Sequence, residues 1–138
     1  RKKVIVDTKP VNAGYYKNSF LITPNLKEAL EIAKTNNLSE AGRAIQKALN
    51  SNVLITKSGE GMTLFEKNKQ INLRARERKV FDPVGAGDTV MAGLALSLAV
   101  GASLKDAATI ANHAAGIVVT KRGTATVSIE ELKEDLLK

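Results

Sequence analysis

Short continuous apolar runs alternate along the chain with longer stretches in which apolar residues have helical spacing. Two runs near the N-terminus are rich in β-branched residues and predict buried strands at 4–7 and 20–23, with a polar loop between them. A third run predicts a strand at 53–56. Two more runs, at 62–65 and 71–73, flank a polar turn and predict a β-hairpin. The first half of the chain therefore supplies the predicted strands.

Helical spacing of apolar residues predicts helices over 26–33, 39–49, 89–100, 104–121 and from Ser128 onward. Residues 89–100 are apolar nearly all round, which predicts a buried helix rather than an amphipathic surface helix. Gly123 is expected to cap the C-terminus of the helix over 104–121. Because buried strands alternate with helices, the pattern predicts an α/β fold with a mainly parallel sheet.

Composition fits one globular domain. The chain has 138 residues, of which 43% are hydrophobic and 25% are charged, and no repeat or linker marks a boundary. It contains no cysteine, no secretory leader pattern and no apolar run long enough to span a membrane, so we expect a soluble, cytoplasmic protein. The chain opens on Arg1 and reaches an apolar run by Val4, which suggests a piece of a longer protein.

The formal net charge of +7 favours anionic partners: nucleic acid, acidic membranes or phosphorylated small molecules. Aromatic residues make up only 4% of the chain, and no basic helix or aromatic RNA-binding motif occurs, which argues against nucleic acid. The longest basic stretch, at 74–79, is interpreted as a solvated connector.

The most informative segment, at 82–95, reads DPVGAGDTVMAGLA. Gly85 and Gly87 permit close backbone approach and open into a helix, whose first N–H groups would point at an anion. Neither a Walker lysine nor the third glycine of a dinucleotide fingerprint is present, because Val90 takes that position. A simple turn, with Asp88 complementing the helix dipole, would explain the same residues.

Residues 82–95 also resemble the second signature of the ribokinase-like (PfkB) carbohydrate kinases. The resemblance implies that Asp88 is the general base that takes the proton from the sugar hydroxyl. It further implies that Gly85, Ala86 and Gly87 form an anion hole for the transferring phosphoryl group. This division of roles suits phosphoryl transfer, which depends mostly on positioning and electrostatic stabilisation.

Asn25 and Glu28 follow a predicted strand and begin a predicted helix. As N-cap and third helical residue, they would satisfy two backbone N–H groups as a variant of the capping box. The same two residues resemble the N-x-x-E motif of the family. The resemblance implies that they help to place Mg²⁺ near the nucleotide phosphates, Asn25 indirectly through water. Both roles are compatible.

Three further segments resemble the bacterial heptose 7-phosphate kinases within the family. The sequence D-T-K matches their D-P-K with Thr8 in place of proline, which implies a phosphate contact by Lys9. The segment from Thr56 reads T-x-S-x-x-G-M, with Ser58 in the place of the more usual glycine and Gly61 retained. Residues 123–128 resemble their G-T-x-T-V-S. These segments imply nucleotide contacts by Lys9, Thr56, Ser58 and Gly61.

Asn112 interrupts an apolar helix face, and the resemblance places it beside the adenine, although a satisfied polar residue would look the same. His113, the only histidine, has no partner pattern for metal binding or catalysis and is given no catalytic role.

Taken as a whole, the resemblance implies the C-terminal, nucleotide-binding half, residues 1–138, of a three-layer α/β/α ribokinase-like kinase domain. The implied activity is ATP-dependent phosphorylation of a sugar or sugar phosphate, most similar to phosphorylation of C1 of heptose 7-phosphate in ADP-heptose synthesis. The expected partners are MgATP, a sugar phosphate and the N-terminal half of the domain. A homodimer is left open, and no nucleic acid or membrane is expected. The alternative is a nucleotide-binding half-domain that does not turn over alone.

Overall fold

The computed structural model describes residues 2–138, and their contacts divide into two compact units. Residues 2–58 and 62–72 form the first, here called the sheet unit, and residues 59–61 and 73–138 form the second, called the helical unit. No composition shift in the sequence indicates this division. Within the described residues, no helix is both long and apolar enough to cross a membrane.

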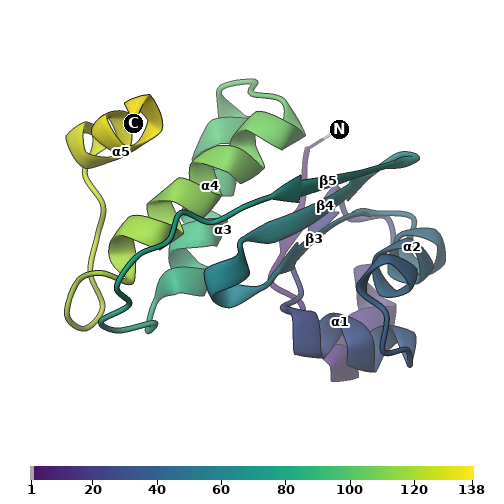
Figure 1. Ribbon diagram of the computed structural model, residues 1–138. Coiled ribbons are helices and arrows are strands. Elements are labelled where there is room, and N and C mark those ends of the chain that lie inside the picture. Colours follow the sequence, from purple (N-terminus) through teal and green to yellow (C-terminus); the bar gives the residue numbers. More distant parts are fainter. Residues whose placement is uncertain (1) are drawn as a thin grey trace. The chain divides into compact units, whose positions relative to one another are not determined.

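The sheet unit is built on a five-stranded sheet in which the strands lie in chain order (Figure 1). The strands are β1 (Ile5–Val6), β2 (Leu21–Ile22), β3 (Asn52–Thr56), β4 (Met62–Glu66) and β5 (Lys69–Leu73). β1, β2 and β3 pair in parallel, whereas β4 pairs antiparallel with β3. The predicted hairpin at the end of the sheet is therefore confirmed, and the predicted parallel part comprises the first three strands.

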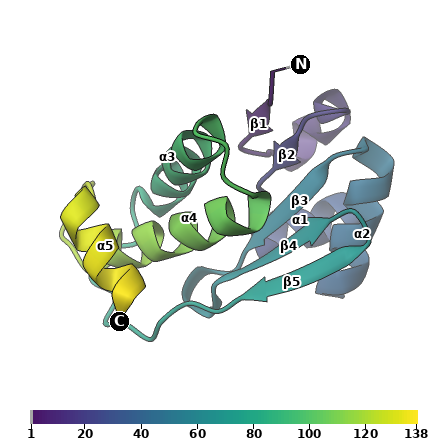
Figure 2. The same cartoon turned by 90° about the horizontal axis from the view of Figure 1, so that it is seen from above.

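Two helices, α1 (Leu26–Ala33) and α2 (Leu38–Leu49), pack against the sheet on one face (Figures 1 and 2). The core between these elements comprises Ile22, Ala29, Ala41, Ile45, Leu49, Val53, Ile55 and Phe65. Each large side chain buried in this way contributes about 1.5–3 kcal/mol. α2 approaches the sheet closely because Gly42 faces Phe65, whose ring would lie 2.2 Å from any added Cβ.

The segment between β1 and β2 differs from the prediction of a polar loop. It contains a 3-10 helix, η1 (Pro10–Tyr16), and a second short 3-10 helix, η2 (Ser58–Glu60), follows β3. Pro10 at the start of η1 has the backbone angle that a helical turn requires. Tyr16 at its end packs against the core, which holds the turn on the sheet unit.

The helical unit contains α3 (Ala86–Ala99), α4 (Leu104–Val118) and α5 (Ile129–Leu137). α3 and α4 lie side by side, and the backbones approach closely where Gly93 faces Ala111. The prediction that α3 is buried on all sides is wrong for this chain. Val90, Leu94, Ser97 and Leu98 are buried, but Leu96 is 71% exposed. α4 covers only one side of an apolar helix.

α4 ends at Val118, three residues before the predicted end, and Gly123 is not its cap. The backbone carbonyl of Val119 instead accepts hydrogen bonds from the N–H groups of Phe81 and Asp82, at 2.7 and 3.1 Å. These long-range bonds satisfy the helix end that a local glycine cap was expected to satisfy.

α5 begins as predicted at Ser128. Its hydroxyl accepts the N–H of Glu131 at 3.1 Å, while the Glu131 carboxylate accepts the N–H of Ser128 at 2.8 Å. Lys121 donates to the same carboxylate at 2.8 Å, so this helix start is closed by residues of the chain itself.

Candidate functional site

Three of the residues singled out in the sequence lie at the carboxyl ends of the parallel strands in the sheet unit. Lys9 follows β1, Asn25 follows β2 and Thr56 ends β3. Asn25 and Thr56 form a parallel bridge, and the Thr56 N–H donates to the Pro24 carbonyl at 3.1 Å. The carboxyl end of an open parallel sheet is the usual place for a ligand in α/β folds.

Asn25 and Glu28 form the predicted capping box at the start of α1. The Asn25 side chain accepts the Glu28 N–H at 2.8 Å, and the Glu28 carboxylate accepts the Asn25 N–H at 2.8 Å. The other carboxylate oxygen of Glu28 lies 3.7 Å from the Lys9 ammonium group. Lys9 and Glu28 thus form an ion pair, whereas the sequence predicts separate ligand contacts for them.

Ser58 and Gly61 flank the turn after β3 and have left-handed backbone conformations, with φ of 51° and 89°. Glycine would adopt the φ of Ser58 without strain, whereas a residue with a Cβ adopts it less readily. Gly61 is buried, and an added Cβ would lie 2.0 Å from the carbonyl oxygen of Leu73. Packing alone therefore requires glycine at position 61.

The start of α3 carries the glycine-rich segment in the helical unit. Gly85 is the N-cap, with φ of 83° and no side chain to cap the helix. Asp88 is the third residue of the helix and is exposed. The N–H of Ala86 donates to the Pro83 carbonyl at 3.3 Å. The first turn of a helix carries a partial positive charge, so Asp88 stands at a place that favours anions.

Gly87 has no structural reason to be glycine. Its φ lies outside the left-handed range, and nothing lies within 4 Å of an added Cβ. Gly85, in contrast, needs its positive φ to begin the helix. The open space beside Gly87 would let a ligand at the helix start approach the backbone closely.

Asp82 holds the loop that leads into α3, a role that sequence reasoning missed. One carboxylate oxygen accepts the Val84 N–H at 2.9 Å, and the other accepts the Gly123 N–H at 3.0 Å. The guanidinium group of Arg122 lies 5.0 Å from the centre of the Phe81 ring on the same loop. The bond to Val84 has a sequence signal, since Asp commonly bonds the backbone two residues ahead in a turn, but the bond to Gly123 has none.

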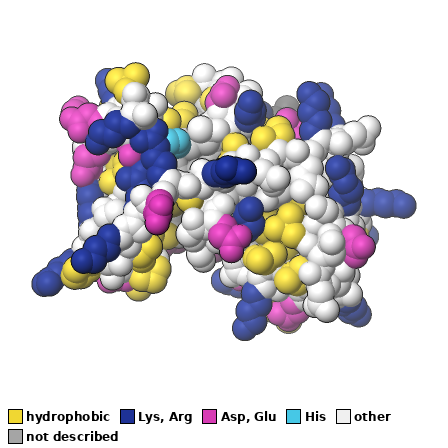
Figure 3. All heavy atoms as spheres, viewed as in Figure 1, with side chains coloured by type: hydrophobic (Ala, Val, Ile, Leu, Met, Phe, Trp, Pro, Cys, Tyr) yellow, Lys and Arg dark blue, Asp and Glu magenta, His cyan; other side chains and the backbone are white. Residues whose placement is uncertain are grey.

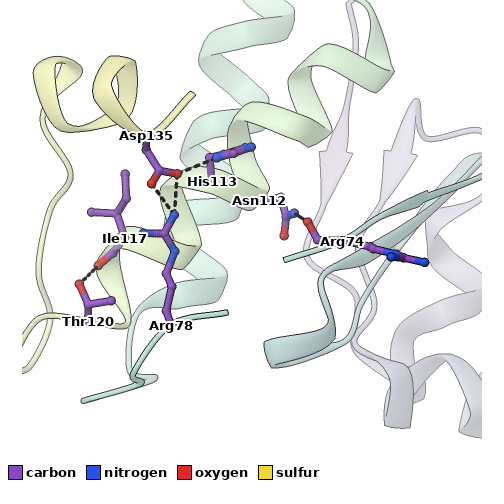
Figure 4. Close-up of polar contacts among 7 residues, drawn as sticks. All are labelled: Arg74, Arg78, Asn112, His113, Ile117, Thr120 and Asp135. Atoms are coloured by element: carbon purple, nitrogen blue, oxygen red, sulfur yellow. Dashed lines mark hydrogen bonds and ion pairs between the residues drawn. The ribbon is translucent and has the colours of Figure 1, made fainter. Parts of the chain in front are cut away.

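Asn112 and the connector after β5 are joined in Figure 4. The Asn112 side-chain amide donates to the backbone carbonyl of Arg74 at 3.0 Å. Arg78, farther along the connector, points at the Asp135 carboxylate of α5 and donates to both of its oxygens, at 2.5 and 2.6 Å. His113 Nδ1 lies 2.6 Å from the same carboxylate. The interpretation of residues 74–79 as a solvated connector is therefore wrong at Arg78, whose side chain is only 20% exposed, whereas Arg74 is exposed as expected.

Asp135 is the centre of this cluster, and its side chain is only 8% exposed. Burial by itself raises the pKa of Asp135, but the hydrogen bonds from Arg78 and His113 outweigh it and lower the pKa to about 2. His113, given no catalytic role from sequence, serves here as a partner that links α4 to α5. Arg78 and Asp135 are 57 positions apart, so no local pattern could have paired them.

The site residues predicted from sequence thus form two groups. Lys9, Asn25, Glu28, Thr56 and Ser58 belong to the sheet unit, whereas Gly61, Gly85, Ala86, Gly87, Asp88 and Asn112 belong to the helical unit. Across residues 2–138, no three Asp, Glu or His side chains gather into a cluster that could hold a metal ion. On the face drawn in Figure 3, Lys and Arg side chains are distributed among acidic ones.

Comparison with known proteins identifies the family of the chain. The family model described as pfkB family carbohydrate kinase matches residues 2–132. The bifunctional protein HldE of Desulfatibacillum aliphaticivorans is 46% identical over 98% of this chain, which spans 29% of the length of that relative.

Two solved structures share the fold. A ribokinase from Thermotoga maritima has a TM-score of 0.87 at 23% identity and covers all of this chain with 50% of its own length. A ribokinase II from E. coli, described in complex with ATP and Mg²⁺, has a TM-score of 0.81 at 19% identity, over 91% of this chain and 41% of its own. These likenesses confirm the three-layer α/β/α, ribokinase-like fold class.

The chain belongs to the pfkB family of carbohydrate kinases. It spans 29% of the length of the HldE relative and 50% of the ribokinase chain.

Proposed function

We propose that this chain carries the phosphoryl-transfer part of an ATP-dependent sugar kinase. The observation that carries the proposal is the start of α3: Asp88 is exposed in the first turn, behind a glycine N-cap that leaves the turn open. Family membership supplies the reaction class, and the helix start supplies a place for the transferring phosphoryl group.

In this reaction the Asp88 carboxylate takes the proton from the acceptor hydroxyl of the sugar. The hydroxyl oxygen then forms a bond to the γ-phosphorus of ATP, the bond to the bridging oxygen breaks, and ADP leaves. The dipole of α3 and the backbone of Gly85, Ala86 and Gly87 stabilise the negative charge on the phosphoryl oxygens, and the Ala86 N–H does so by sharing or leaving its 3.3 Å bond to the Pro83 carbonyl. Asp88 would contribute about 10²- to 10⁴-fold as a general base.

Asn25 and Glu28 fit a role in placing Mg²⁺ through water. Their oxygens are the type of donor that Mg²⁺ prefers, but the capping box already engages both side chains. Glu28 also lies near Lys9. A hydrogen bond to metal-bound water requires no break in these contacts, whereas direct ligation would compete with them. When bound, Mg²⁺ would neutralise part of the negative charge on the nucleotide phosphates.

The remaining contacts predicted for the nucleotide are Lys9, Thr56, Ser58, Gly61 and Asn112. Lys9 is 62% exposed and can reach a phosphate. The Asn112 amide nitrogen is engaged by Arg74, which leaves its side-chain oxygen as the atom available to an adenine amino group.

We further propose a heptose 7-phosphate as the acceptor, phosphorylated at C1 in the cytoplasm for ADP-heptose synthesis. The support is the match of T-x-S-x-x-G-M at 56–62 and G-T-x-T-V-S at 123–128 to the heptose kinases, together with the net charge of +7, which suits an anionic sugar and MgATP. An additional N-terminal part would supply most of the sugar site, and a homodimer is compatible with this arrangement.

A comparison of turnover with binding tests the proposal. The 138-residue chain and a form extended to the length of its relatives are each incubated with MgATP and heptose 7-phosphate, and ADP release is measured. We expect turnover in the extended form. Absence of turnover with every sugar phosphate and sugar tried would contradict the kinase proposal.

A second candidate is a half-domain that binds nucleotide without turnover alone, favoured by the 29% coverage of its relatives. Binding of a non-hydrolysable ATP analogue to the 138-residue chain, without ADP release, would support it. Turnover by this chain alone would exclude it.

The Mg²⁺ role is tested separately by Glu28→Gln in the extended form. Glutamine keeps an acceptor for the Asn25 N–H, so capping survives while the charge near the metal is lost. We expect the Mg²⁺ concentration needed for half-maximal turnover to rise. An unchanged Mg²⁺ titration would leave Glu28 a capping residue only.

A further inference from the structure

The segment that leads into α3 is fastened along α4 at successive points. It comprises residues 74–85 and is here called the lead-in segment. Its first carbonyl, that of Arg74, accepts the Asn112 side-chain amide at 3.0 Å, within α4. Near its other end, the N–H of Phe81 donates to the Val119 carbonyl at 2.7 Å, just beyond α4. The lead-in segment therefore runs along α4 towards the C-terminus of that helix before α3 begins.

Arg78 fastens the middle of the lead-in segment to α5. Its side chain passes Gly116 of α4, where an added Cβ would lie 3.0 Å from the guanidinium Nε, and one terminal nitrogen donates to both oxygens of the Asp135 carboxylate (Figure 4). His113 Nδ1, from α4, lies 2.6 Å from the same carboxylate. One side chain of α5 thus holds both the lead-in segment and α4.

This contact is made with charged groups in a buried place. Among residues 2–138, Asp135 is the only charged residue that is buried. Because both ions lose water, a buried ion pair is often no more stabilising than apolar side chains of similar size. A charge-assisted hydrogen bond is directional, however, whereas apolar packing is not. The cluster therefore fixes where Arg78 lies more closely than an apolar contact would.

The start of α3 depends on the segment that precedes it. Its N-cap, Gly85, has no side chain that could hold the first turn, and Asp88 in that turn is exposed. The position of the Asp88 carboxylate therefore follows from where the lead-in segment delivers the backbone.

We propose that Arg78 and Asp135 are positioning residues for phosphoryl transfer, because they hold the lead-in segment that sets the start of α3. The inference rests on the proposed function, in which Asp88 is the base. Both residues act through the backbone of the lead-in segment. A shift of about 1 Å in a catalytic group can lower turnover about 10²-fold. Since the backbone bond at Val119 remains when Arg78 is released, we expect a smaller loss, of about 10-fold.

Steady-state kinetics of the extended form give the first test, with Asp135→Asn and Arg78→Gln. Each substitution removes one charge of the cluster but keeps a polar side chain. We expect kcat to fall about 10-fold in each variant, while the KM for MgATP changes less than about 3-fold. Rates are compared at a temperature at which every variant is folded. A kcat within about 2-fold of the parent in both variants would overturn the proposal.

A double variant separates positioning from stability. Arg78→Met with Asp135→Leu replaces the ion pair by an apolar pair, which should bring the denaturant midpoint back towards that of the parent. We expect kcat to stay low, since the directional contact is still missing. Recovery of kcat together with the midpoint would show a structural role only. Ile45→Val is the matched control, because it weakens the buried core of the sheet unit and should leave kcat unchanged.

Hydrogen exchange needs no turnover and therefore separates failure of this proposal from failure of the proposed function. Exchange is measured by mass spectrometry in peptides 82–90 and 26–33 of the extended form, in the parent and in Asp135→Asn. We expect exchange to be faster by about 10-fold or more in 82–90 and unchanged in 26–33. Equal acceleration in both peptides, or none in 82–90, would overturn the proposal. Acceleration confined to 82–90 in a protein without turnover would support the positioning role and contradict the proposed function.

Discussion

The starts of α1 and α3 place a carboxylate at the same helical position and use it differently. At α1, Glu28 returns to the N-cap Asn25, and the two residues satisfy each other. At α3, the N-cap is Gly85, which has no side chain, and Asp88 is exposed. α5 repeats the closed arrangement with Ser128 and Glu131. A closed start mainly stabilises its helix, whereas an open start leaves its N–H groups and carboxylate available to a ligand.

If this comparison holds, the largest effect is that of Asp88→Asn on turnover. Loss of the general base should lower kcat by about 10²- to 10⁴-fold, while nucleotide affinity and the free energy of unfolding stay near those of the parent. Steady-state kinetics of the extended form with MgATP, together with binding of an ATP analogue, measures both. Near-normal kcat would remove Asp88 as the base and make α3 an ordinary helix start.

For Asp135, a carboxylate that contacts only protein groups among the described residues, substitution should lower the stability of the fold. Asp135→Ala leaves the partly buried Arg78 and His113 without their anion and should lower the free energy of unfolding by about 3 kcal/mol. Denaturant unfolding of the 138-residue chain tests this. A stability loss below that of an exposed ion pair, about 1 kcal/mol, would contradict the structural role.

Asp135 also determines how the free energy of unfolding changes at low pH. The pKa of Asp135 is about 2 in the folded chain, below its ordinary value of 3.8, so its contribution is fully present above about pH 4. It is lost as the pH falls towards 2. The difference in the free energy of unfolding between the parent and Asp135→Asn should therefore shrink over that range. A difference that does not change with pH would show that the pKa of Asp135 is not lowered.

Removal of the closed start at α1 should have a smaller effect. Asn25→Ala deprives the Glu28 N–H of its acceptor and should lower the free energy of unfolding by about 1 kcal/mol. Ser128→Ala at α5 is the matched variant and should give a similar loss in thermal or denaturant unfolding. If Asn25→Ala leaves the free energy of unfolding unchanged, the closed start does not stabilise α1.

The smallest stability effect, and the one with opposite sign, is expected at Gly87. Gly87→Ala fills open space at a helical position and should raise the free energy of unfolding by about 0.5–1 kcal/mol. It should nevertheless weaken binding of an ATP analogue, because the added methyl group blocks close approach to the backbone. Gly85→Ala, at a φ of 83°, should instead destabilise the chain. Unimpaired binding by Gly87→Ala would place the phosphate elsewhere.

Local chemistry explains which features could be predicted from the sequence. The range of α1, its capping box, the cap of α5 and the hairpin all depend on residues a few positions apart, and the structure confirms them. The start of α3 was predicted three residues late, at 89 instead of Ala86, because Gly-Ala-Gly has a low helix propensity.

Features that depend on distant residues could not be predicted. The carboxylate of Asp82 bonds Gly123, and Arg78 pairs with Asp135, without any pattern that links these positions in sequence. The exposure of Leu96 was missed for a different reason. Its apolar surroundings in sequence indicate burial, but α4 covers only one side of α3, and Leu96 lies on the other side.

The two kinds of helix start can be compared within one NMR sample. Backbone amide resonances of the 138-residue chain are recorded by NMR while a non-hydrolysable MgATP analogue is added. We expect saturable shifts at Gly87 and Asp88 in the open start of α3, and none at Glu130 and Glu131 in the closed start of α5. Shifts of equal size at both starts, or none at α3, would show that the open start of α3 is not the phosphate site.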